Sequence, residues 1–209
     1  MKLDLVILGS GESGMGAAHL AASLRQKAFL SDQGLIPEEK KNELLSLGIS
    51  FEEGGHSVAV FESRLIVKSP GIPDTAEIIQ LAENEGIEII SEVEYGFRYM
   101  PGDAKVIAIS GTNGKTTTTL LTYHLLKSAG FDVAVAGNVG YSFAKRVSER
   151  PYQYFVLEVS SFQLDNIVSF KPNISVLLNI TPDHLDRYNY QFERYIASKF
   201  RITDNLSKN

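Results

Sequence analysis

Short apolar runs alternate with amphipathic segments along the whole chain. Apolar runs that end in glycine or a polar residue are typical of buried parallel strands, and apolar residues at helical spacing predict the helices between them. The alternation predicts an α/β fold with parallel sheets that helices cover on both faces. The expected strands are Leu3–Leu8, Ala28–Ser31, Val58–Phe61, Leu65–Val67, Ile87–Ile90, Val106–Ile109, Val133–Ala136, Phe155–Leu157 and Ile174–Leu178.

The segments between these strands have the composition of helices, and several begin with capping residues. Ser13 is expected to cap the first helix, while Asp74 with Glu77 and Ser91 with Glu94 match the capping-box pattern at two others. The expected helices are Met15–Gln26, Glu38–Leu47, a segment starting at Asp74, a segment from Ser91 to about Tyr99, Thr116–Ala129 and Phe192–Thr203.

The stretch M-P-G-D-A-K at 100–105 separates the two halves of the chain. Proline and glycine end the preceding helix, and a new apolar strand begins at Val106. We therefore predict two units, one over residues 1–100 and the other over residues 101–209, each with its own parallel sheet.

Composition excludes several classes of protein. The 209 residues include 20 Lys and Arg against 25 Asp and Glu, a net charge of −5 that gives no general attraction to nucleic acid. The absence of cysteine excludes disulfides, thiolate metal sites and a cysteine nucleophile. The first residues do not resemble a signal peptide, and no apolar stretch approaches the roughly 20 residues that span a bilayer. We expect a soluble, cytoplasmic, monomeric protein without a nucleic-acid or membrane partner.

The first glycine-rich loop lies in V-I-L-G-S-G-E-S-G-M-G at 6–16, where Gly9, Gly11 and Gly14 match G-x-G-x-x-G. A strand before such a loop and a helix after it are the context of a dinucleotide site, with the phosphates at the helix N-terminus. Asp32 ends the second strand, where an acid would bind a ribose hydroxyl. The alternative is a tight turn without a ligand, and the pattern does not say which nucleotide would bind.

The second glycine-rich loop, S-G-T-N-G-K-T-T-T-T at 110–119, has the features of a nucleoside triphosphate site. Backbone N–H groups of residues 111–114 can surround phosphates, Lys115 can reach the β and γ phosphates, and Thr116 can ligate Mg²⁺. Ile109 departs from the general pattern, which has glycine there. Glu158 ends an apolar strand, so it is expected near Thr116 as a second metal ligand.

Four motifs together resemble the Mur ligase family, the ATP-dependent amide-forming enzymes of bacterial cell-wall precursor synthesis. The resemblance covers the whole chain and is most specific in the second half, and the family tolerates a residue other than glycine at position 109. The motifs are G-T-N-G-K-T-T-T-T at 111–119, A-G-N-V-G at 136–140, L-E-V-S-S-F-Q-L at 157–164 and N-I-T-P-D-H-L-D-R-Y at 179–188. L-E-V-S-S-F-Q-L most resembles the member that adds D-glutamate to UDP-N-acetylmuramoyl-L-alanine.

The resemblance implies that the first unit is a Rossmann-like domain that holds the uridine diphosphate of the substrate rather than NAD. It implies that the second unit is part of a P-loop NTPase-like central domain, which holds ATP. The implied contacts to the UDP substrate are Glu12, Ser13, Asp32, Gln33, Ser69, Gly71, Asn138, Ser160 and Gln163. The implied contacts to ATP are Gly111, Thr112, Asn113, Gly114, Lys115, Thr116 and Thr117.

The resemblance also implies catalytic and metal-binding roles that single residues do not reveal. Thr116 and Glu158 would hold one Mg²⁺, and His184 would belong to a second Mg²⁺ site. Lys199 matches a lysine that the family carbamylates into a metal ligand, and Lys115, His184 and Lys199 would be catalytic. Taken alone, His184 is a loop histidine and Lys199 a solvated helix lysine.

The implied reaction activates the alanyl carboxylate with ATP as an acyl phosphate, which the amine of D-glutamate then attacks. Two Mg²⁺ ions and Lys115 would offset the repulsion between the carboxylate and the triphosphate. The family also has the rest of the central domain and a third, amino-acid-binding domain, neither of which has a counterpart here. We expect this chain to bind the UDP substrate and to make no product alone.

Another Mur-type ligase remains an alternative, and so do four other functions. An NAD-dependent oxidoreductase would rest on G-x-G-x-x-G alone. A P-loop kinase or GTPase would not need the first unit, and the guanine-reading N-K-x-D motif is absent. A folylpolyglutamate-type ligase shares the G-T-N-G-K loop but would lack a separate UDP-binding unit. A non-catalytic nucleotide-binding module is the last.

Overall fold

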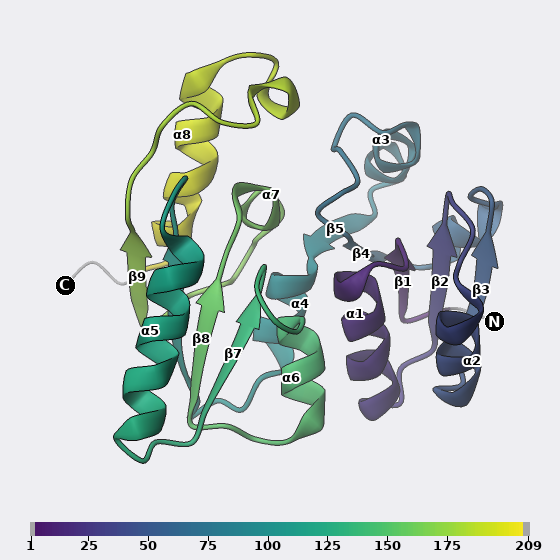
Figure 1. Cartoon of the computed structure of the whole chain (residues 1–209). Coiled ribbons are helices and arrows are strands. Elements are labelled where there is room, and N and C mark those ends of the chain that lie inside the picture. The colour runs from purple at the N-terminus through teal and green to yellow at the C-terminus, as the bar shows by residue number, and fades with distance from the viewer. Residues whose placement is uncertain (1–2, 207–209) are drawn as a thin grey trace.

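A computed structural model describes residues 3–206 and places the first half of the chain around a parallel sheet (Figure 1). Its five strands lie in the order β3-β2-β1-β4-β5, so the chain starts in the centre and builds outward on both sides. The strands are β1 (Leu5–Leu8), β2 (Ala28–Asp32), β3 (Ser50–Glu53), β4 (Leu65–Lys68) and β5 (Glu88–Ser91). All four residues of β1 are buried, which explains why this strand reads as an uninterrupted apolar run.

The helices of this half are α1 (Glu12–Ser23), α2 (Glu38–Ser46), α3 (Glu77–Asn84) and α4 (Glu92–Tyr99), with a 3₁₀ helix η1 at Val58–Glu62. Two predicted caps are wrong. The cap of α1 is Gly11 and involves no side chain, so Ser13 lies inside the helix. The side chain of Asp74 accepts from Lys68 Nζ at 2.7 Å instead of capping α3, which begins three residues later.

One predicted strand is also wrong, because Val58–Phe61 forms the 3₁₀ helix η1, with Ser57 Oγ accepting from the N–H of Ala59. The strand in this part of the chain is β3, whose sequence S-F-E-E has no apolar run. The acidic side chains fit because β3 lies at the edge of the sheet and is only partly buried.

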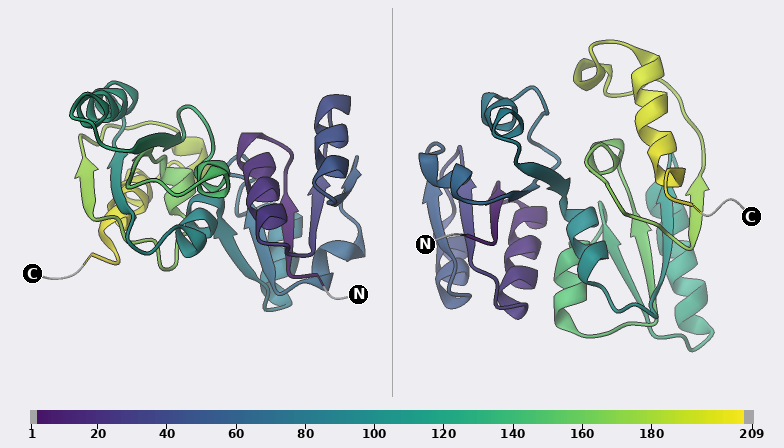
Figure 2. Two further views of the ribbon diagram at one scale, coloured as in Figure 1. Left: turned by 90° about the horizontal axis from the view of Figure 1, so that it is seen from below. Right: turned by 180° about the vertical axis from the view of Figure 1, so that it is seen from behind.

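The second half forms a sheet of four parallel strands in the order β7-β8-β6-β9, which confirms the predicted α/β fold. Figure 1 and Figure 2 show it beside the first sheet, with the two chain ends on opposite sides of the molecule. The strands are β6 (Lys105–Ser110), β7 (Val133–Gly137), β8 (Tyr154–Glu158) and β9 (Ile174–Leu177). The helices are α5 (Lys115–Ser128), α6 (Phe143–Glu149), α7 (Ser161–Leu164) and α8 (Phe192–Phe200), with 3₁₀ helices η2 (Leu185–Tyr188) and η3 (Arg201–Thr203).

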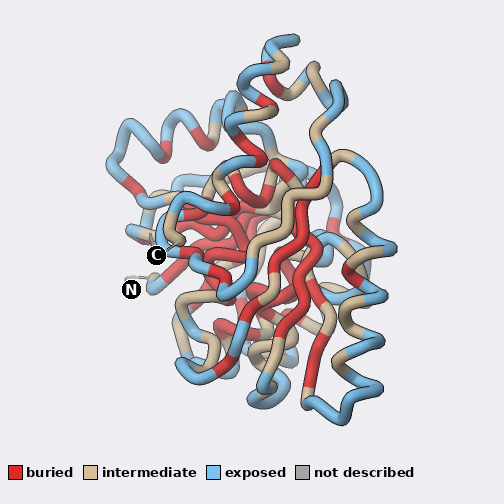
Figure 3. The backbone as a smooth tube through the Cα atoms, turned by 90° about the vertical axis from the view of Figure 1, so that its left-hand side faces the viewer, coloured by how far each residue is buried: buried red, intermediate tan, exposed pale blue. Residues whose placement is uncertain are grey.

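Helices α1, α4 and α6 pack together where the two halves meet. Two glycines allow the close approach, because a Cβ added at Gly16 would lie 1.6 Å from Ser142 Oγ, and one added at Gly96 would lie 2.8 Å from Phe143 Cδ1. Side chains near this junction belong to the apolar cores of both halves. Tyr95 and Ala144 pack in the core around the first sheet, and Phe143 packs in the core around the second sheet. The two sheets are therefore connected by packed helices as well as by the chain. Figure 3 shows the buried positions gathered in the strands, with exposed positions along the outer helix faces.

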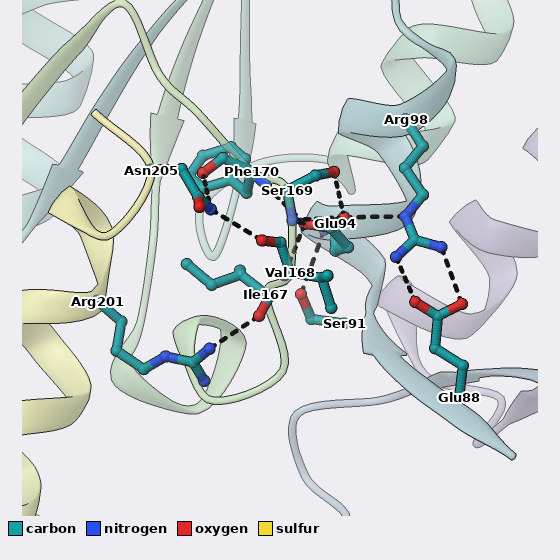
Figure 4. Close-up of polar contacts among 10 residues, drawn as sticks. All are labelled: Glu88, Ser91, Glu94, Arg98, Ile167, Val168, Ser169, Phe170, Arg201 and Asn205. Carbon is teal, nitrogen blue, oxygen red and sulfur yellow. Dashed lines mark hydrogen bonds and ion pairs between the residues drawn. The ribbon is translucent and has the colours of Figure 1, made fainter. Parts of the chain in front are cut away.

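A buried carboxylate also connects the halves (Figure 4). Ser91 Oγ caps α4 by accepting from the N–H of Glu94, as predicted, but the reciprocal half of the capping box does not form. The fully buried side chain of Glu94 instead accepts from the N–H groups of Val168, Ser169 and Phe170 and from the hydroxyl of Ser169. This carboxylate therefore fixes the loop between α7 and β9 to helix α4.

Candidate functional site

The first glycine loop forms one wall of a cavity of about 670 Å³ at the carboxyl ends of β1, β2 and β4. Gly9 has a positive φ of 92°, and a Cβ on Gly14 would lie 1.8 Å from Gly9 O, so only glycine allows helix α1 to begin against the loop. The cavity is lined by Gly9, Ser10, Gly11, Asp32, Gln33, His56, Ser69, Gly71, Ile72, Pro73, Ala76, Glu77, Ile78 and Leu81.

Four of the residues predicted to contact a UDP substrate, Asp32, Gln33, Ser69 and Gly71, line this cavity. The hydroxyl oxygen of Ser69 is buried and has no hydrogen-bond partner among the described residues, so it is free to bind a ligand. Asp32 accepts from the N–H groups of Ser10 and Gly34. Burial alone would raise the pKa of Asp32, but these hydrogen bonds outweigh it and keep the pKa below its ordinary value.

The side chains of Glu12 and Ser13 do not line this cavity, although both were predicted to contact the UDP substrate. Glu12 Oε1 accepts from the N–H of Ser142 at 3.1 Å, so this side chain faces the second half of the chain. Both residues lie in the first turn of α1, where their backbone N–H groups remain available to an anion.

The second glycine loop connects β6 to α5 and is braced by the segment that follows β9. Gly111 and Gly114 have positive φ values of 150° and 84°. A Cβ on Gly111 would lie 3.1 Å from Leu178 Cβ. The N–H groups of Thr112 and Asn113 both donate to Asn179, one to its carbonyl oxygen and one to its side chain. The segment after β9 therefore braces the second glycine loop.

Two lysines meet inside this loop. Lys115 Nζ donates to Gly111 O at 2.9 Å and to Thr112 O at 2.8 Å, and Lys199 Nζ donates to Gly111 O at 2.8 Å. Lys199 is only 2% exposed, so the interpretation of this residue, taken alone, as a solvated helix lysine is wrong. Burial lowers the pKa of Lys199 to about 8, and the charge of Lys115 contributes to the shift. Two cationic groups beside one carbonyl form a site suited to a polyanion.

Glu158 receives a hydrogen bond on each carboxylate oxygen. Thr116 Oγ1 donates to Oε2 at 2.7 Å, and Asn138 Nδ2 donates to Oε1 at 2.7 Å. The strand register explains why these three residues are in contact. Glu158 pairs with Ile109 of β6, which precedes the second glycine loop, and with Gly137 of β7, which precedes Asn138. Thr116 and Glu158, which were predicted to be neighbours, therefore lie together at the carboxyl ends of the strands. A hydroxyl and a carboxylate there suit Mg²⁺.

A small cavity of about 120 Å³ brings together predicted residues from distant parts of the second half. His184 is exposed at this cavity, with its Nε2 3.5 Å from Asp183 Oδ2, and Asp183 Oδ1 accepts from the N–H of His184. Across residues 3–206, no group of three His, Asp or Glu side chains is placed to hold a metal ion. The cavity is lined by Lys115, Asn138, Ser160, Ser161, Phe162, Asp183, His184, Tyr195 and Lys199.

Gln163, a predicted substrate contact, forms a capping box with Ser160 in the structure. Its side-chain Oε1 accepts from the N–H of Ser160, while Ser160 Oγ accepts from the N–H of Gln163. Gln163 is buried, so it fixes the start of helix α7 and does not line the cavity beside Ser160.

Thr117, a predicted contact to ATP, lies exposed in the first turn of α5, at the same end of the helix as Thr116.

Several residues at this site escaped the sequence analysis. Tyr195 is buried with its hydroxyl 3.0 Å from Thr112 Oγ1, and Lys199 Nζ lies 4.7 Å from the centre of its ring. The only sequence signal was the spacing of four residues between Tyr195 and Lys199, which places both on one face of α8. Arg187 stacks on the Phe162 ring and donates to the carbonyls of Pro70 and Gly71, so it connects the surroundings of the two cavities.

Comparisons with known proteins agree with the motifs. Residues 4–78 match the family model of the MurD N-terminal domain, and residues 109–209 match that of the Mur ligase middle domain. The chain is 52% identical over 208 residues to the UDP-N-acetylmuramoylalanine–D-glutamate ligase of Cytophaga hutchinsonii, covering 99% of this chain and 46% of that protein. It is 52% identical over 206 residues to the enzyme of the same name from Porphyromonas gingivalis strain W83, covering 98% and 45%. The chain therefore spans slightly less than half the length of these relatives.

Solved structures of lower identity show the same fold. The UDP-N-acetylmuramate:L-alanyl-gamma-D-glutamyl-meso-diaminopimelate ligase from Neisseria meningitides has a TM-score of 0.66 and 19% identity, covering 100% of this chain and 70% of that one. The UDP-N-acetylmuramate-alanine ligase from Thermotoga maritima has a TM-score of 0.60 and 23% identity, covering 98% and 47%. Within residues 3–206, no helix is both long enough and apolar enough to cross a membrane.

Proposed function

Because the chain belongs to the Mur ligase family, we propose that it carries the UDP-substrate-binding unit and part of the ATP-binding unit of a D-glutamate ligase. The reaction would join D-glutamate to UDP-N-acetylmuramoyl-L-alanine with ATP, in the synthesis of peptidoglycan precursors. We propose that the units divide at residues 100–105, between the end of α4 and the start of β6.

The observation that carries this proposal is the position of Glu158 between two loops. One carboxylate oxygen is bound by Thr116 of the ATP loop and the other by Asn138 of the loop after β7. The first cavity supports the same proposal, because its glycine loop and the unpartnered Ser69 hydroxyl suit a diphosphate. The NAD-dependent alternative has no comparable support, since the first unit matches the MurD N-terminal domain.

The donor set at the second loop fits Mg²⁺, because Thr116 Oγ1 and Glu158 Oε2 are oxygen atoms 2.7 Å apart beside the glycine loop, and Mg²⁺ prefers oxygen ligands. When bound there, Mg²⁺ would neutralise phosphate charge. His184 and Lys199 border the small cavity and would serve a second ion, provided that Lys199 is converted to a carbamate. An unmodified ammonium group at Lys199 would repel a cation.

The chain's own residues supply positioning and positive charge for the proposed reaction. The N–H groups at the N-terminus of α5 and the ammonium of Lys115 would hold the triphosphate, so that the alanyl carboxylate can attack the γ-phosphorus and displace ADP. The acyl phosphate formed would lose phosphate when the amine of D-glutamate attacks its carbonyl. Asn138 and Ser160 border the same cavity as Lys115 and would orient the end of the UDP substrate that reacts.

We further propose that the protein acts in the cytoplasm as a monomer, with ATP, UDP-N-acetylmuramoyl-L-alanine and D-glutamate as small-molecule partners. The net charge of −5 supports the absence of a nucleic-acid partner.

Calorimetric titration of this chain tests the proposal, with UDP, UDP-N-acetylmuramoyl-L-alanine, NAD and ATP with Mg²⁺ as separate ligands. We expect both uridine ligands to bind and NAD not to bind. Lys115→Ala should weaken ATP binding about tenfold or more and leave UDP binding unchanged, because the ammonium belongs to the second loop only. Binding of NAD with no response to UDP would contradict the proposed function.

A further inference from the structure

A histidine that the sequence analysis did not single out lies on the wall of the first cavity. His56 follows β3 in the loop G-G-H-S, after Gly54 and Gly55, whose φ values are 77° and 152°. Glycine is favoured at both positions, and the loop they form brings His56 to the same cavity as Asp32 and Gln33. The ring is only partly buried, so part of it remains accessible to a ligand.

A chain of hydrogen bonds fixes which nitrogen of the His56 ring carries a proton. Ser31 is fully buried at the end of β2, and its register partner on β3 is Glu52. Ser31 Oγ lies 2.6 Å from Glu52 Oε1 and 2.6 Å from His56 Nδ1. Burial would raise the pKa of Glu52, but hydrogen bonds from Ser31 and Ser57 hold it below its ordinary value, so the group is an ionised acceptor.

The single proton of the Ser31 hydroxyl must therefore go to Glu52, and the hydroxyl oxygen must accept from His56. That requirement places a proton on His56 Nδ1. A neutral imidazole has one donor nitrogen and one acceptor nitrogen, so Nε2 of the neutral ring carries a lone pair. Nε2 has no hydrogen-bond partner among residues 3–206, which leaves this lone pair available to a ligand.

The topology indicates which part of a bound nucleotide would reach His56. The diphosphate belongs at the first glycine loop and the N-terminus of α1, next to β1. The group that reacts must extend toward the second half, which packs against α1 and α4 (Figure 1). Strands β2 and β3 lie on the opposite side of β1 from β4 and β5, so the base at the other end of the nucleotide would lie near His56.

We propose that His56 selects the base of the UDP substrate, with its Nε2 accepting a hydrogen bond from the N3–H of uracil. The inference rests on the proposed function, since it assumes a uridine nucleotide in this cavity. Uracil carries a proton on N3, whereas cytosine has a lone pair there. With cytosine, two lone pairs would face each other and neither would be satisfied, so the site discriminates between bases of equal size.

Titration of the 209-residue chain with UDP, CDP and 3-methyl-UDP at about pH 8 tests this role. We expect wild type to bind UDP about tenfold or more tightly than CDP or 3-methyl-UDP, which lacks the N3 proton. His56→Ala should bind all three within about twofold of one another. His56→Gln should bind UDP and CDP similarly, because an amide can rotate to present either a donor or an acceptor.

His124→Ala is the matched control, since His124 lies exposed on helix α5, away from this cavity, and should keep the wild-type preference. Circular dichroism melts would establish that each variant is folded. If UDP binds and His56→Gln and His56→Ala both keep the wild-type preference, the role of His56 is wrong while the proposed function stands. If wild type binds no uridine nucleotide, both proposals fail.

Discussion

Lys115 and Lys199 donate to the same carbonyl oxygen of Gly111, at 2.9 Å and 2.8 Å. The two residues come from the first turn of α5 and the last turn of α8. Burial disfavours the charge on Lys199, whose pKa falls to about 8, and the nearby charge of Lys115 adds to this shift. A neutral amine is therefore accessible near physiological pH, and carbon dioxide reacts only with neutral amines.

We predict that Lys199 forms a carbamate. In bicarbonate enriched with ¹³C, NMR should show a carbamate signal that grows between about pH 7 and pH 9, because the neutral fraction of an amine rises as pH passes its pKa. Lys199→Arg should remove the signal, and Lys127→Ala, a change at the end of α5, should retain it. A spectrum without the signal at any pH in this range would rule the carbamate out.

The contact between Thr116 and Glu158 predicts a metal-dependent effect on ATP binding. Glu158→Gln keeps the shape of the side chain but removes the charge, so we expect the affinity for ATP with Mg²⁺ to fall about 10- to 100-fold. Without Mg²⁺ the variant should bind ATP no more weakly than wild type. Thr116→Ser, which keeps the hydroxyl, is the control and should stay close to wild type. An equal loss with and without Mg²⁺ would mean that Glu158 is not a metal ligand.

Local chemistry explains which features the sequence could predict. Gly9, Gly14, Gly111 and Gly114 revealed both loops, because close approach or a positive φ limits these positions to glycine. The contact between Thr116 and Glu158 could be predicted because the carboxyl ends of neighbouring parallel strands lie on the same side of the sheet.

Features that depend on distant partners were not predictable. Glu94 matches a capping box in sequence, yet its carboxylate bonds a loop 74 to 76 residues away. The register of β2 with β3 likewise gives His56 its partner Ser31, 25 residues away. In each case the competing interaction is set by tertiary packing rather than by neighbours in sequence.

The Glu94 connection predicts an acid-sensitive loss of stability. Burial would raise the pKa of Glu94, but hydrogen bonds from Ser169, Val168 and Arg98 outweigh it and lower the pKa below 4.5. The folded state thus holds fewer protons than the unfolded state at acid pH, so this stabilisation is present above about pH 4.5 and is lost as pH falls through the lowered pKa.

Glu94→Gln should therefore lower the free energy of unfolding by about 2–4 kcal/mol at pH 7, because several N–H groups lose an ionised acceptor. The difference from wild type should shrink as the pH falls below 4.5 and through the lowered pKa. Urea unfolding across pH 3 to 7 measures both effects. Glu88→Gln is the control, since Glu88 binds Arg98 at the surface and should cost less than about 1 kcal/mol. A constant difference across the pH range would show that the charge on Glu94 is not what stabilises the loop.

Glu92, two residues earlier on α4, should have the opposite pH dependence. Its carboxyl is 1% exposed, Oε1 accepts from the N–H of Ala144, and Oε2 has no partner among the described residues. Burial raises the pKa of Glu92 to about 7; the hydrogen bonds from Ala144 and Ser142 oppose the shift and the nearby charge of Glu12 adds to it. The folded state then binds more protons than the unfolded state between about pH 4.5 and 7, so stability falls as pH rises through that window.

The expected loss of stability from Glu92 is at most about 3.4 kcal/mol, because its pKa rises from 4.5 to about 7. Glu92→Gln cannot ionise, so its stability relative to wild type should rise by about 1–3 kcal/mol between pH 5 and pH 8.5. Thermal or urea unfolding of both proteins at these pH values gives the difference directly, and other titrating groups cancel in the comparison. Glu149→Gln, at the exposed end of α6, should follow wild type throughout. Parallel curves for wild type and Glu92→Gln would mean that Glu92 is ionised in the folded protein at neutral pH, and that the junction of α1, α4 and α6 accommodates its charge.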